Sequence, residues 1–527
     1  MANPADTVHS QLPRLDRHKP KCGPVRPSRT GRWRAAVLVA VHVAIALHVW
    51  HFHVRGTTIS PLEPSESMQT LEQGLVNAGF LLFAGSVLAT LLLGRWFCGW
   101  ACHVVALQDA CAWLLARLGL KPKPVRSRLL VGIPFGVAFY MFLWPTLKRW
   151  WEGAPGPELQ WELHTSDFWR TFPGPWMAVA TFVVVGFLVV WWLGAKGFCT
   201  YGCPYGGVFA VADRFAPGRI RVTDACDGCG HCTQVCTSNV RVHEEVAVHR
   251  MVVDPACMKC LDCVSTCPKE ALHFGFGAVK PAVLSQQRIA ARADFSWGEE
   301  LVLAALFLAG LFAWRGTWLT EPVPLLMAVG LGAITAVMGL MAFRLLRQRE
   351  FTFQHARLRV EGQFTRSGWA ALLLTVAWFA FTAWAGSANL SSARAGEAGA
   401  RVMLEQRTRQ QERRELLPRA DVLAAADAVA RALQVNFDSD PALLQLEGLL
   451  RREAGDHAAA ERLLQQAVDG VRHPGDLPRA LVALAIYQRD RGNLEQAAAM
   501  ARLVLERSPD NQSARVLLQQ LEQALRR

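Results

Sequence analysis

Long apolar blocks separated by polar segments are the first feature of this chain. Seven blocks are near the length of a helix that crosses a bilayer. They predict helices at residues 35–53, 78–93, 129–145, 176–193, 299–314, 322–343 and 369–385. The pattern therefore predicts a polytopic α-helical membrane protein. The fifth block is short and begins with Glu299 and Glu300, so whether it crosses decides the side on which the carboxyl-terminal region lies.

From about Ala400 the pattern changes to helical periodicity in a sequence rich in Ala, Leu, Arg, Glu and Gln. One motif recurs with an offset of 37 residues, as Gly455-x4-Ala460-x3-Leu464-x2-Ala467 and Gly492-x4-Ala497-x3-Ala501-x2-Val504, followed by Pro509. This resembles a short tetratricopeptide array, with flanking helices near 421–434 and 512–526. Such arrays bind peptides or partner proteins in a concave groove. An unrelated bundle of helical hairpins is the alternative.

Composition and charge agree with a membrane protein. Of 527 residues, 52% are hydrophobic and 19% charged, with a mean hydropathy of +0.17. The net charge of +13 does not indicate nucleic acid, because the basic residues cluster beside apolar blocks, at 1–34, 117–128 and 344–366. The positive-inside rule places these segments in the cytoplasm and the acidic loops at 63–72 and 152–167 outside. Seven spans of a bacterial inner membrane then put the carboxyl-terminal region in the periplasm.

Eight cysteines between residues 226 and 268 carry the clearest chemical signal. They form two runs, Cys226-x2-Cys229-x2-Cys232-x3-Cys236 and Cys257-x2-Cys260-x2-Cys263-x3-Cys267-Pro268. In two-cluster ferredoxins of this spacing the fourth cysteine of each run crosses to the other cluster. The sequence therefore predicts two 4Fe-4S clusters, one held by Cys226, Cys229, Cys232 and Cys267, and one by Cys257, Cys260, Cys263 and Cys236. Zinc knuckles or disulfides are the alternative, although zinc ligand pairs are usually further apart.

Two further cysteine pairs follow the second and fourth apolar blocks. Cys98-x3-Cys102 and Cys199-x3-Cys203 lie 101 residues apart, which indicates a repeated two-helix unit. An i, i+4 pair lies on one face of a helix, so two such faces are predicted to converge on a third cluster or another metal centre. A redox-active dithiol and ordinary buried apolar residues are the alternatives. The acidic residues near the runs, Glu245 among them, are expected on the solvated surface.

Taken in order, these motifs resemble a known family. Phe97-Cys98-Gly99-Trp100-Ala101-Cys102, Phe198-Cys199-Thr200-Tyr201-Gly202-Cys203-Pro204-Tyr205-Gly206 and the two cysteine runs are similar to the membrane polyferredoxins of the NosR, NapH and CcoG group, over residues 35–275. The resemblance implies a membrane-bound carrier with two 4Fe-4S clusters, in respiratory electron transfer or in maturation of a respiratory metalloenzyme. His103 departs from the proline usual after the first pair. A flavin-binding domain of the NosR kind and the immunoglobulin-like domain of CcoG are not expected.

The predicted fold is thus an α-helical polytopic membrane protein with an inserted two-cluster ferredoxin-like α+β domain and a tetratricopeptide-like helical region. The expected parts are a basic tail at 1–34, a four-helix core at 35–200, the ferredoxin domain at 201–280, three further spans at 299–386 and the helical repeats at 400–527.

The leading functional hypothesis is electron transfer between a membrane donor such as quinol and a redox partner protein. One alternative is a copper reductase or assembly factor that binds metal at Cys98, Cys102, Cys199 and Cys203. Another is a scaffold that recruits a protein or peptide through its tail. Membrane lipid is an expected partner and nucleic acid is not. The sequence shows no phosphate loop, dinucleotide fingerprint or nucleophile triad.

Overall fold

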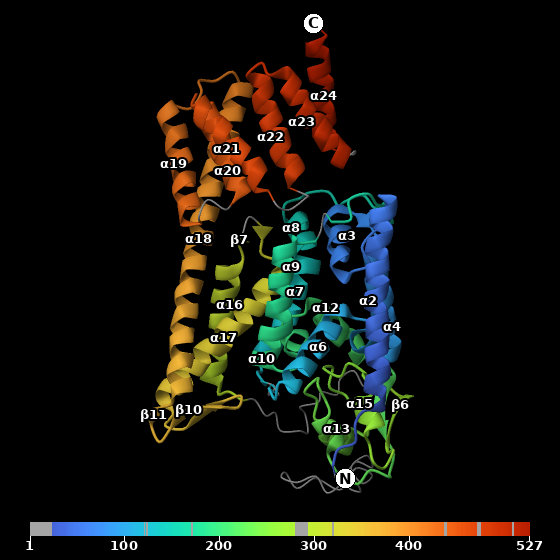
Figure 1. Ribbon diagram of the computed structural model, residues 1–527. Helices are drawn as coiled ribbons and strands as arrows, with labels where there is room; N and C mark the ends of the chain where they lie inside the picture. The colour runs from blue at the N-terminus through green and yellow to red at the C-terminus, as the bar shows by residue number, and fades with distance from the viewer. Residues whose placement is uncertain are drawn as a thin grey trace. The chain divides into compact units, whose positions relative to one another are not determined.

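The computed structural model of the chain describes residues 24–526, except 121, 123–124, 170–171, 280–293, 319–320, 437–439, 472–475 and 509–510 (Figure 1). The chain divides into two compact units. One comprises residues 1–168, 182–306 and 336–368, and the other comprises residues 169–181, 307–335 and 369–527. Most of the predicted basic tail and the predicted Pro509 terminator lie outside the described residues.

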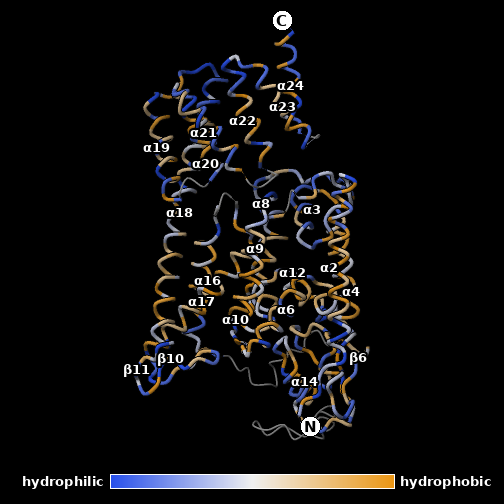
Figure 2. The backbone as a smooth tube through the Cα atoms, in the orientation of Figure 1, coloured by the Kyte–Doolittle hydropathy of each residue, from blue (hydrophilic) through white to orange (hydrophobic). Residues whose placement is uncertain are grey.

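Seven apolar helices lie where the seven apolar blocks predict them. They are α2 (Arg29–Arg55), α4 (Ala78–Leu93), Leu130–Trp151 (η3, α7, η4 and α8), Pro175–Leu193 (α9, η5 and α10), α16 (Trp297–Trp314), α17 (Leu325–Arg347) and the first part of α18 (Arg366–Gln411). Figure 2 shows apolar residues following one another along them. By length and composition six of these described helices are able to cross a membrane, and α4 is a shorter apolar helix of 16 residues.

The start of α2 corrects the boundary of the predicted tail. The helix begins at Arg29, because the side chain of Ser28 accepts the N–H of Gly31 at 2.9 Å and so caps the first turn. The same hydroxyl donates to Asp262 Oδ1 at 2.6 Å. Residues 29–34, predicted as part of the basic tail, are therefore helical and held against the ferredoxin domain.

The third and fourth spans each contain one wide π turn. In the third span this turn is η4 (Phe139–Leu143), between α7 (Ile133–Ala138) and α8 (Trp144–Trp151). Pro145 follows it and has no N–H with which to close an ordinary α turn. In the fourth span the turn is η5 (Val183–Leu188), between α9 and α10.

Short strands join the two loops that precede the second and fourth spans. β1 (Thr58–Ile59) pairs antiparallel with β4 (His164–Thr165), and β2 (Leu75–Val76) pairs parallel with β3 (Gln160–Trp161). The two loops therefore lie on the same side of the first unit, as the alternation of acidic and basic loops predicts.

Short helices follow the spans in a repeated order. α5 (Trp96–Trp100) and α6 (His103–Arg117) come after the second span, and α11 (Gly197–Tyr201) and α12 (Pro204–Arg214) come after the fourth. The remaining short elements are η2 (Pro64–Glu66), α3 (Ser67–Gln73), η3 (Leu130–Gly132), the hairpin of β7 (Thr317–Trp318) and β8 (Glu321–Pro322), and the sheet of β9 (Phe351–Phe353), β10 (Ala356–Val360) and β11 (Gln363–Phe364).

The two cysteine runs lie in a small α+β domain. β5 (Gly218–Val222) pairs antiparallel with β6 (Leu272–Phe276) over all five residues, so the strands bring the two ends of the segment together. The helices α13 (His231–Gln234), α14 (Val242–His249) and α15 (Asp262–Ser265) lie between them in sequence. The core consists of valine, isoleucine and leucine side chains from both strands and from α14, with the cysteines packed against it.

The carboxyl-terminal helices form an array in which each helix packs on the next. The array contains α19 (Arg419–Val435), α20 (Pro441–Glu453), α21 (His457–Gly470), α22 (Leu477–Asp490), α23 (Leu494–Arg507) and α24 (Gln512–Leu525). The motif glycines Gly455 and Gly492 form the turns before α21 and α23 with φ of 79° and 85°, a conformation that favours glycine. The small and apolar motif residues that follow are buried at equivalent positions.

Candidate functional site

The eight cysteines of the two runs line two small cavities. One, here called the distal cage, is lined by Cys226, Cys229, Cys232 and Cys267. The other, the proximal cage, is lined by Cys236, Cys257, Cys260 and Cys263. Each cage thus takes three cysteines from one run and the fourth from the other, which is the partition expected from the spacing. None of the eight forms a disulfide.

Burial raises the pKa of thiols in both cages. The pKa of Cys232 rises to about 12 through burial and through its neighbours Cys226 and Cys229. The pKa of Cys236 also rises to about 12, through burial and through Cys257. Four thiolates in such a place are costly without compensating positive charge, which iron supplies. The donor set therefore fits a 4Fe-4S group.

In both cages four cysteines line one small cavity. Thiolates arranged around a space suit a polynuclear iron-sulfur cluster, whereas a zinc knuckle usually has two ligand pairs that are further apart in the sequence.

Both cages are built on the same backbone loop, repeated with an offset of 31 residues. Gly228 and Gly230 in the first run have φ of 73° and 81°, and Lys259 and Leu261 at the matching positions have φ of 51° and 63°. Glycine adopts such angles freely, whereas residues with a side chain are strained there. The loop turns backbone N–H groups toward the sulfurs, since those of Gly228 and Lys259 approach the first thiol of their own run.

Neither CxxxC pair lies on one helical face, which corrects the expectation of an i, i+4 pair. Cys98 lies in α5 while Cys102 caps α6, and Cys199 lies in α11 while Cys203 caps α12. The chain leaves the helix before the second cysteine and starts a new helix after it. Pro204 suits that first helical position because it lacks an N–H. His103 occupies the same position in α6, so it does not change the break.

The structure nevertheless brings these four cysteines together, as the four-thiol site. The pKa of Cys102 is raised to about 12, first by burial and then by the neighbouring thiols of Cys98 and Cys203. Burial and Cys98 raise the pKa of Cys203 to about 11. Both capping thiols face the positive end of a helix, where the N–H of Gly206 donates to Cys203 Sγ at 3.4 Å. The four thiols therefore come together because Cys102 and Cys203 stand at the starts of α6 and α12, and not because each pair shares one helical face.

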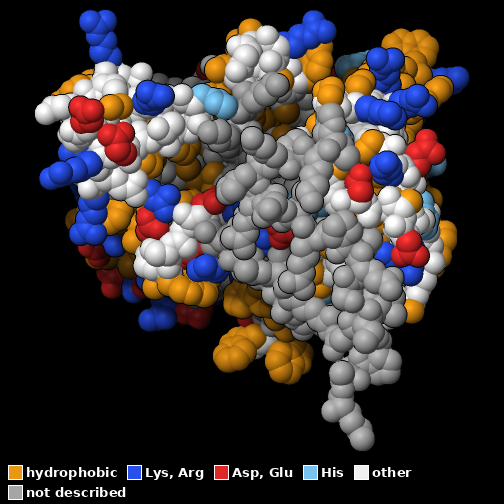
Figure 3. All heavy atoms as spheres, turned by 90° about the horizontal axis from the view of Figure 1, so that it is seen from below, with side chains coloured by type: hydrophobic (Ala, Val, Ile, Leu, Met, Phe, Trp, Pro, Cys, Tyr) orange, Lys and Arg blue, Asp and Glu red, His pale blue; other side chains and the backbone are white. Residues whose placement is uncertain are grey.

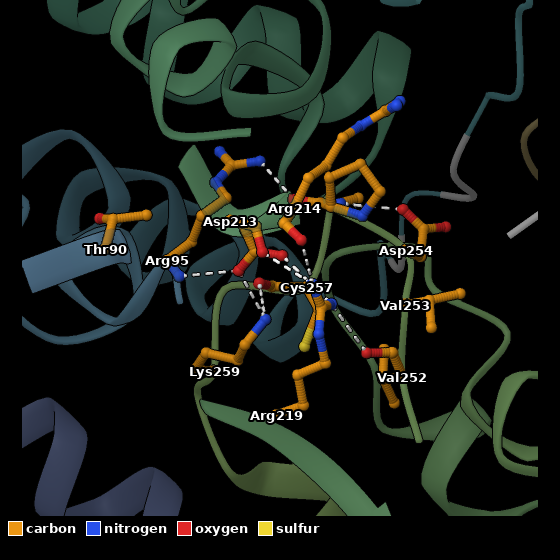
Figure 4. A network of polar contacts seen from close by, with 12 residues as sticks. Thr90, Arg95, Asp213, Arg214, Arg219, Val252, Val253, Asp254, Cys257 and Lys259 are labelled. Carbon is orange, nitrogen blue, oxygen red and sulfur yellow. Dashed lines mark hydrogen bonds and ion pairs between the residues drawn. The ribbon is translucent and has the colours of Figure 1, made fainter. Parts of the chain in front are cut away.

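Buried charges join the four-thiol site to the proximal cage, and Figure 4 shows them at close range. Asp213 of α12 is fully buried, and its carboxylate accepts the backbone N–H of Arg95 at 3.0 Å and Nζ of Lys259 at 2.8 Å. The guanidinium of Arg219 lies 3.6 Å from the other carboxylate oxygen. We call these four residues the Asp213 network. It holds three cations and one anion, and the buried carboxylate of Asp254 also interacts with Arg95 and Lys259.

Arg95 contacts the four-thiol site and the chain just before the proximal cage. Its Nη1 donates to the carbonyl oxygen of Pro255 at 2.8 Å, and its Nη2 lies 3.9 Å from Cys98 Sγ. Its side chain is buried. A single guanidinium therefore links the four-thiol site with the chain that leads into the proximal cage.

The short helix α5 is pressed against the proximal-cage loop. Trp100 Nε1 donates to the carbonyl oxygen of Lys259 at 3.0 Å. A Cβ atom on Gly99 would come within 2.2 Å of the carbonyl oxygen of Met258. Met258 itself belongs to the apolar cluster that contains Cys98 and Cys199. The proximal cage and the four-thiol site are thus separated by about one layer of side chains.

Further ion pairs flank the four-thiol site. His103 Nε2 lies 3.1 Å from Glu63 Oε1. Burial is the largest single influence on the pKa of Glu63 and raises it, but the hydrogen bond and charge of His103 and the hydrogen bond of Ser65 together bring the pKa below its usual value. Beside the proximal cage, Arg34 lies 3.2 Å from Asp109 and 3.3 Å from Asp262, which ties α2 to α6 and to the ferredoxin domain.

Sequence reasoning missed most of these charged residues. Glu245, expected on the surface, is 1% exposed and accepts the N–H groups of Val253 and Asp254 at 3.0 and 3.2 Å. Arg95 and Lys259 lie beside or within cysteine motifs in the sequence, and this position could have indicated that they contact the cysteine sites. Asp213 gave no such indication, because it lies outside the cysteine motifs and is 118 and 46 residues from Arg95 and Lys259.

A cleft of about 670 Å³ opens beside the four-thiol site and the proximal cage. Its wall includes Cys199 and Met258, and apolar residues from the beginnings of two spans, Val131, Phe135 and Trp297. Five arginines also line it, namely Arg95, Arg126, Arg128, Arg214 and Arg241. The cleft therefore combines hydrogen-bond donors with an apolar wall near the membrane segments.

Two family profiles match the chain. One, described as a 4Fe-4S binding domain, matches residues 77–121 and 175–223, which contain the CxxxC pairs. The other, described as a 4Fe-4S dicluster domain, matches residues 218–268, which contain the cysteine runs. The chain therefore contains 4Fe-4S binding domains.

Several known proteins are similar to this chain. The putative electron transport protein YccM of Escherichia coli is 26% identical over 331 residues, 55% of this chain and 87% of YccM. The ferredoxin-type protein NapH of Haemophilus influenzae is 25% identical over 208 residues, 38% of this chain and 67% of NapH. The methylamine utilization ferredoxin-type protein MauN of Methylobacillus flagellatus is 29% identical over 181 residues, 33% of this chain and 60% of MauN. No solved structure matches. The chain is thus homologous to ferredoxin-type electron transport proteins.

Proposed function

We propose that this protein is a membrane-bound electron-transfer protein with one 4Fe-4S cluster in the distal cage and one in the proximal cage. The crossed partition of the eight cysteines around two cavities carries the proposal, together with the dicluster match over the same residues. The clusters supply one-electron chemistry when bound. The chain's own residues set where each cluster lies and which charges surround it.

The contacts in the first unit support an order of sites. The distal cage borders exposed residues such as Ala225 and Lys269. The proximal-cage loop packs against α5 beside the four-thiol site. We therefore assign the distal cage to exchange with a redox partner protein and the four-thiol site to the inner end of the route. That site serves as a relay or holds a third cluster.

The arginine-lined cleft supports a donor from the membrane at this inner end. Quinol is the candidate, because its ring suits the apolar wall of Phe135 and Trp297, and its oxygens are able to accept hydrogen bonds from the arginines. A respiratory chain, or the maturation of a respiratory metalloenzyme, is the setting that we propose.

Charge supports the proposed orientation in a bacterial inner membrane. At the end of the first unit that carries the ferredoxin domain, Arg126 of the basic segment 117–128 donates to Asn239 Oδ1 at 3.0 Å. The view from below shows Lys and Arg side chains at several places, with Asp and Glu side chains among them (Figure 3). By the positive-inside rule this end faces the cytoplasm. With seven spans, the carboxyl-terminal array is then periplasmic, where we propose that it acts as a tetratricopeptide-like binding module.

Iron analysis of anaerobically purified protein tests the proposal. Two cubane clusters predict about eight irons per chain, and a third cluster predicts about twelve. Paramagnetic resonance of the reduced protein should show 4Fe-4S signals. Colourless protein without these signals contradicts the proposal. If the Cys98→Ser/Cys199→Ser variant keeps the wild-type iron content and rate of electron transfer, the four-thiol site has no role in the route.

A second function is favoured by the ion pair beside the four-thiol site. His103 and Glu63 place an imidazole and a carboxylate next to Cys102, and a metal such as copper, as substrate, would meet these groups on its way to the thiols. In this metal reductase or assembly reading, the Cys98→Ser/Cys199→Ser variant keeps its irons but lowers metal loading of a client enzyme. Wild-type loading in that variant excludes the reading.

A further inference from the structure

Alternate helices of the carboxyl-terminal array line one groove. In the second unit α20 packs against α22 and α22 packs against α24, in addition to the contacts between consecutive helices. Figure 1 shows α20, α22 and α24 following one another along the array. The groove has a volume of about 640 Å³, and its wall comes from α18, α20, α22 and the start of α24.

The groove has a basic rim and an apolar floor. Its arginines are Arg407, Arg452 and Arg479, and its apolar residues include Leu449, Val482 and Ile486. None of the described residues that line it is acidic. The region from residue 400 onward has nearly as many acidic as basic residues, so the excess of arginine is local to the groove.

Two of these guanidinium groups are available to a ligand. Arg452 is engaged, since it lies 2.7 Å from Glu453 and 3.4 Å from Asp490. Arg407 and Arg479 are exposed and pair with no carboxylate among the described residues. Exposed cations over an apolar floor suit a ligand that carries both carboxylates and aliphatic groups.

We propose that this groove binds an extended acidic segment of a partner protein, with carboxylates on Arg407 and Arg479 and aliphatic side chains on Val482 and Ile486. Guanidinium groups bind carboxylates through paired hydrogen bonds, and an extended chain presents alternate side chains to one surface. The two longest segments of the chain outside the described part, residues 1–23 and 280–293, do not fit, because they carry more basic than acidic side chains. The proposal is independent of the electron route.

Peptide binding to the full chain in neutral-lipid nanodiscs tests the proposal. The probes are a labelled dodecapeptide of alternating Glu and Leu and its counterpart with Gln in place of Glu. Saturable binding of the Glu peptide, roughly tenfold or more tighter than that of the Gln peptide and weakened by salt, is expected. Equal binding of the two probes, or no binding of the Glu peptide, overturns the proposal.

A matched pair of variants locates the binding. Arg407→Gln/Arg479→Gln should weaken binding of the Glu peptide at least about tenfold, because both carboxylate contacts are lost. Arg462→Gln removes an exposed arginine of α21 outside the groove and should change binding less than about twofold. Helical content and iron content report that the variants are folded. If both changes weaken binding of the Glu peptide equally, the assignment to this groove is wrong. It is also wrong if the wild type is a dimer that Arg407→Gln/Arg479→Gln dissociates, because the groove then binds a second copy of this chain.

Discussion

Lys259 shows how one residue ties the ferredoxin domain to the membrane helices. Its backbone has a positive φ of 51°, where the matching residue of the first run is Gly228. Glycine would relieve this strain, but it would leave Asp213 without the ammonium group at 2.8 Å. The buried ion pair thus offsets the backbone strain and holds the proximal-cage loop against α12.

Replacing Asp213 by Asn should loosen this junction. Lys259 and Arg219 would remain buried without their carboxylate, and breaking such an arrangement costs about 3–5 kcal/mol. The temperature at which the cluster absorbance is lost should fall markedly. The Asp213→Asn/Lys259→Met variant removes one of the two buried cations left without a carboxylate. Its transition temperature should therefore lie between those of Asp213→Asn and the wild type. An unchanged transition in Asp213→Asn contradicts the role of the network.

Removing the Arg95 guanidinium should lower reduction potentials. Reduction adds negative charge, and a buried cation 3.9 Å from Cys98 Sγ favours the reduced form. A unit charge near 4 Å contributes a few kcal/mol at an effective dielectric constant of about 20, so Arg95→Gln should shift the midpoint of the nearer site by roughly 50–150 mV. A redox titration followed by paramagnetic resonance measures it. Arg55→Gln, at the exposed far end of α2, is the control and should leave the midpoints unchanged.

At the level of elements, the spans and the cysteine sets were accessible to sequence reasoning, and the junction between them was not. Apolar length predicts helices, and ligand type with spacing predicts the partition of the cysteines. The break before Cys102 was missed, because i, i+4 spacing suits one continuous helix as well as two helices with a cap between them. The network around Asp213 was missed because its members meet only when α5, α12 and the ferredoxin loop pack together.

Gly99 tests the contact between α5 and the proximal-cage loop. An added Cβ would meet the carbonyl oxygen of Met258 at 2.2 Å, so Gly99→Ala must displace the loop, at a cost of about 1–3 kcal/mol. We expect earlier thermal loss of one cluster signal and slower electron transfer to the four-thiol site. Gly85→Ala in α4 is the matched control, since a Cβ there meets nothing within 4 Å. Equal behaviour of the two variants would show that α5 does not control the loop.

Three parts of the molecule are built from duplicated pieces. The CxxxC unit repeats at 101 residues, the cysteine run at 31 and the helical hairpin at 37. In each case the two copies together form one structure. The CxxxC units form the four-thiol site, the cysteine runs form the two cages, and the helical hairpins contribute to the groove. α18 joins the last apolar span to the array without a break. Its 46 residues extend for about 69 Å, well beyond the roughly 30 Å of a bilayer core.

Because the array has its own hydrophobic core, the clusters should not depend on it. The apolar residues of α19–α24 pack on one another and on the polar half of α18, whereas all twelve paired cysteines lie in the first unit. A chain ending at Ser392 removes the array together with the half of α18 that covers it, so no large apolar face is left open. We expect this chain to retain the wild-type iron content and the spectrum of the reduced clusters, and to lose binding of the acidic peptide. Loss of iron on truncation would instead mean that the cages need the array to form.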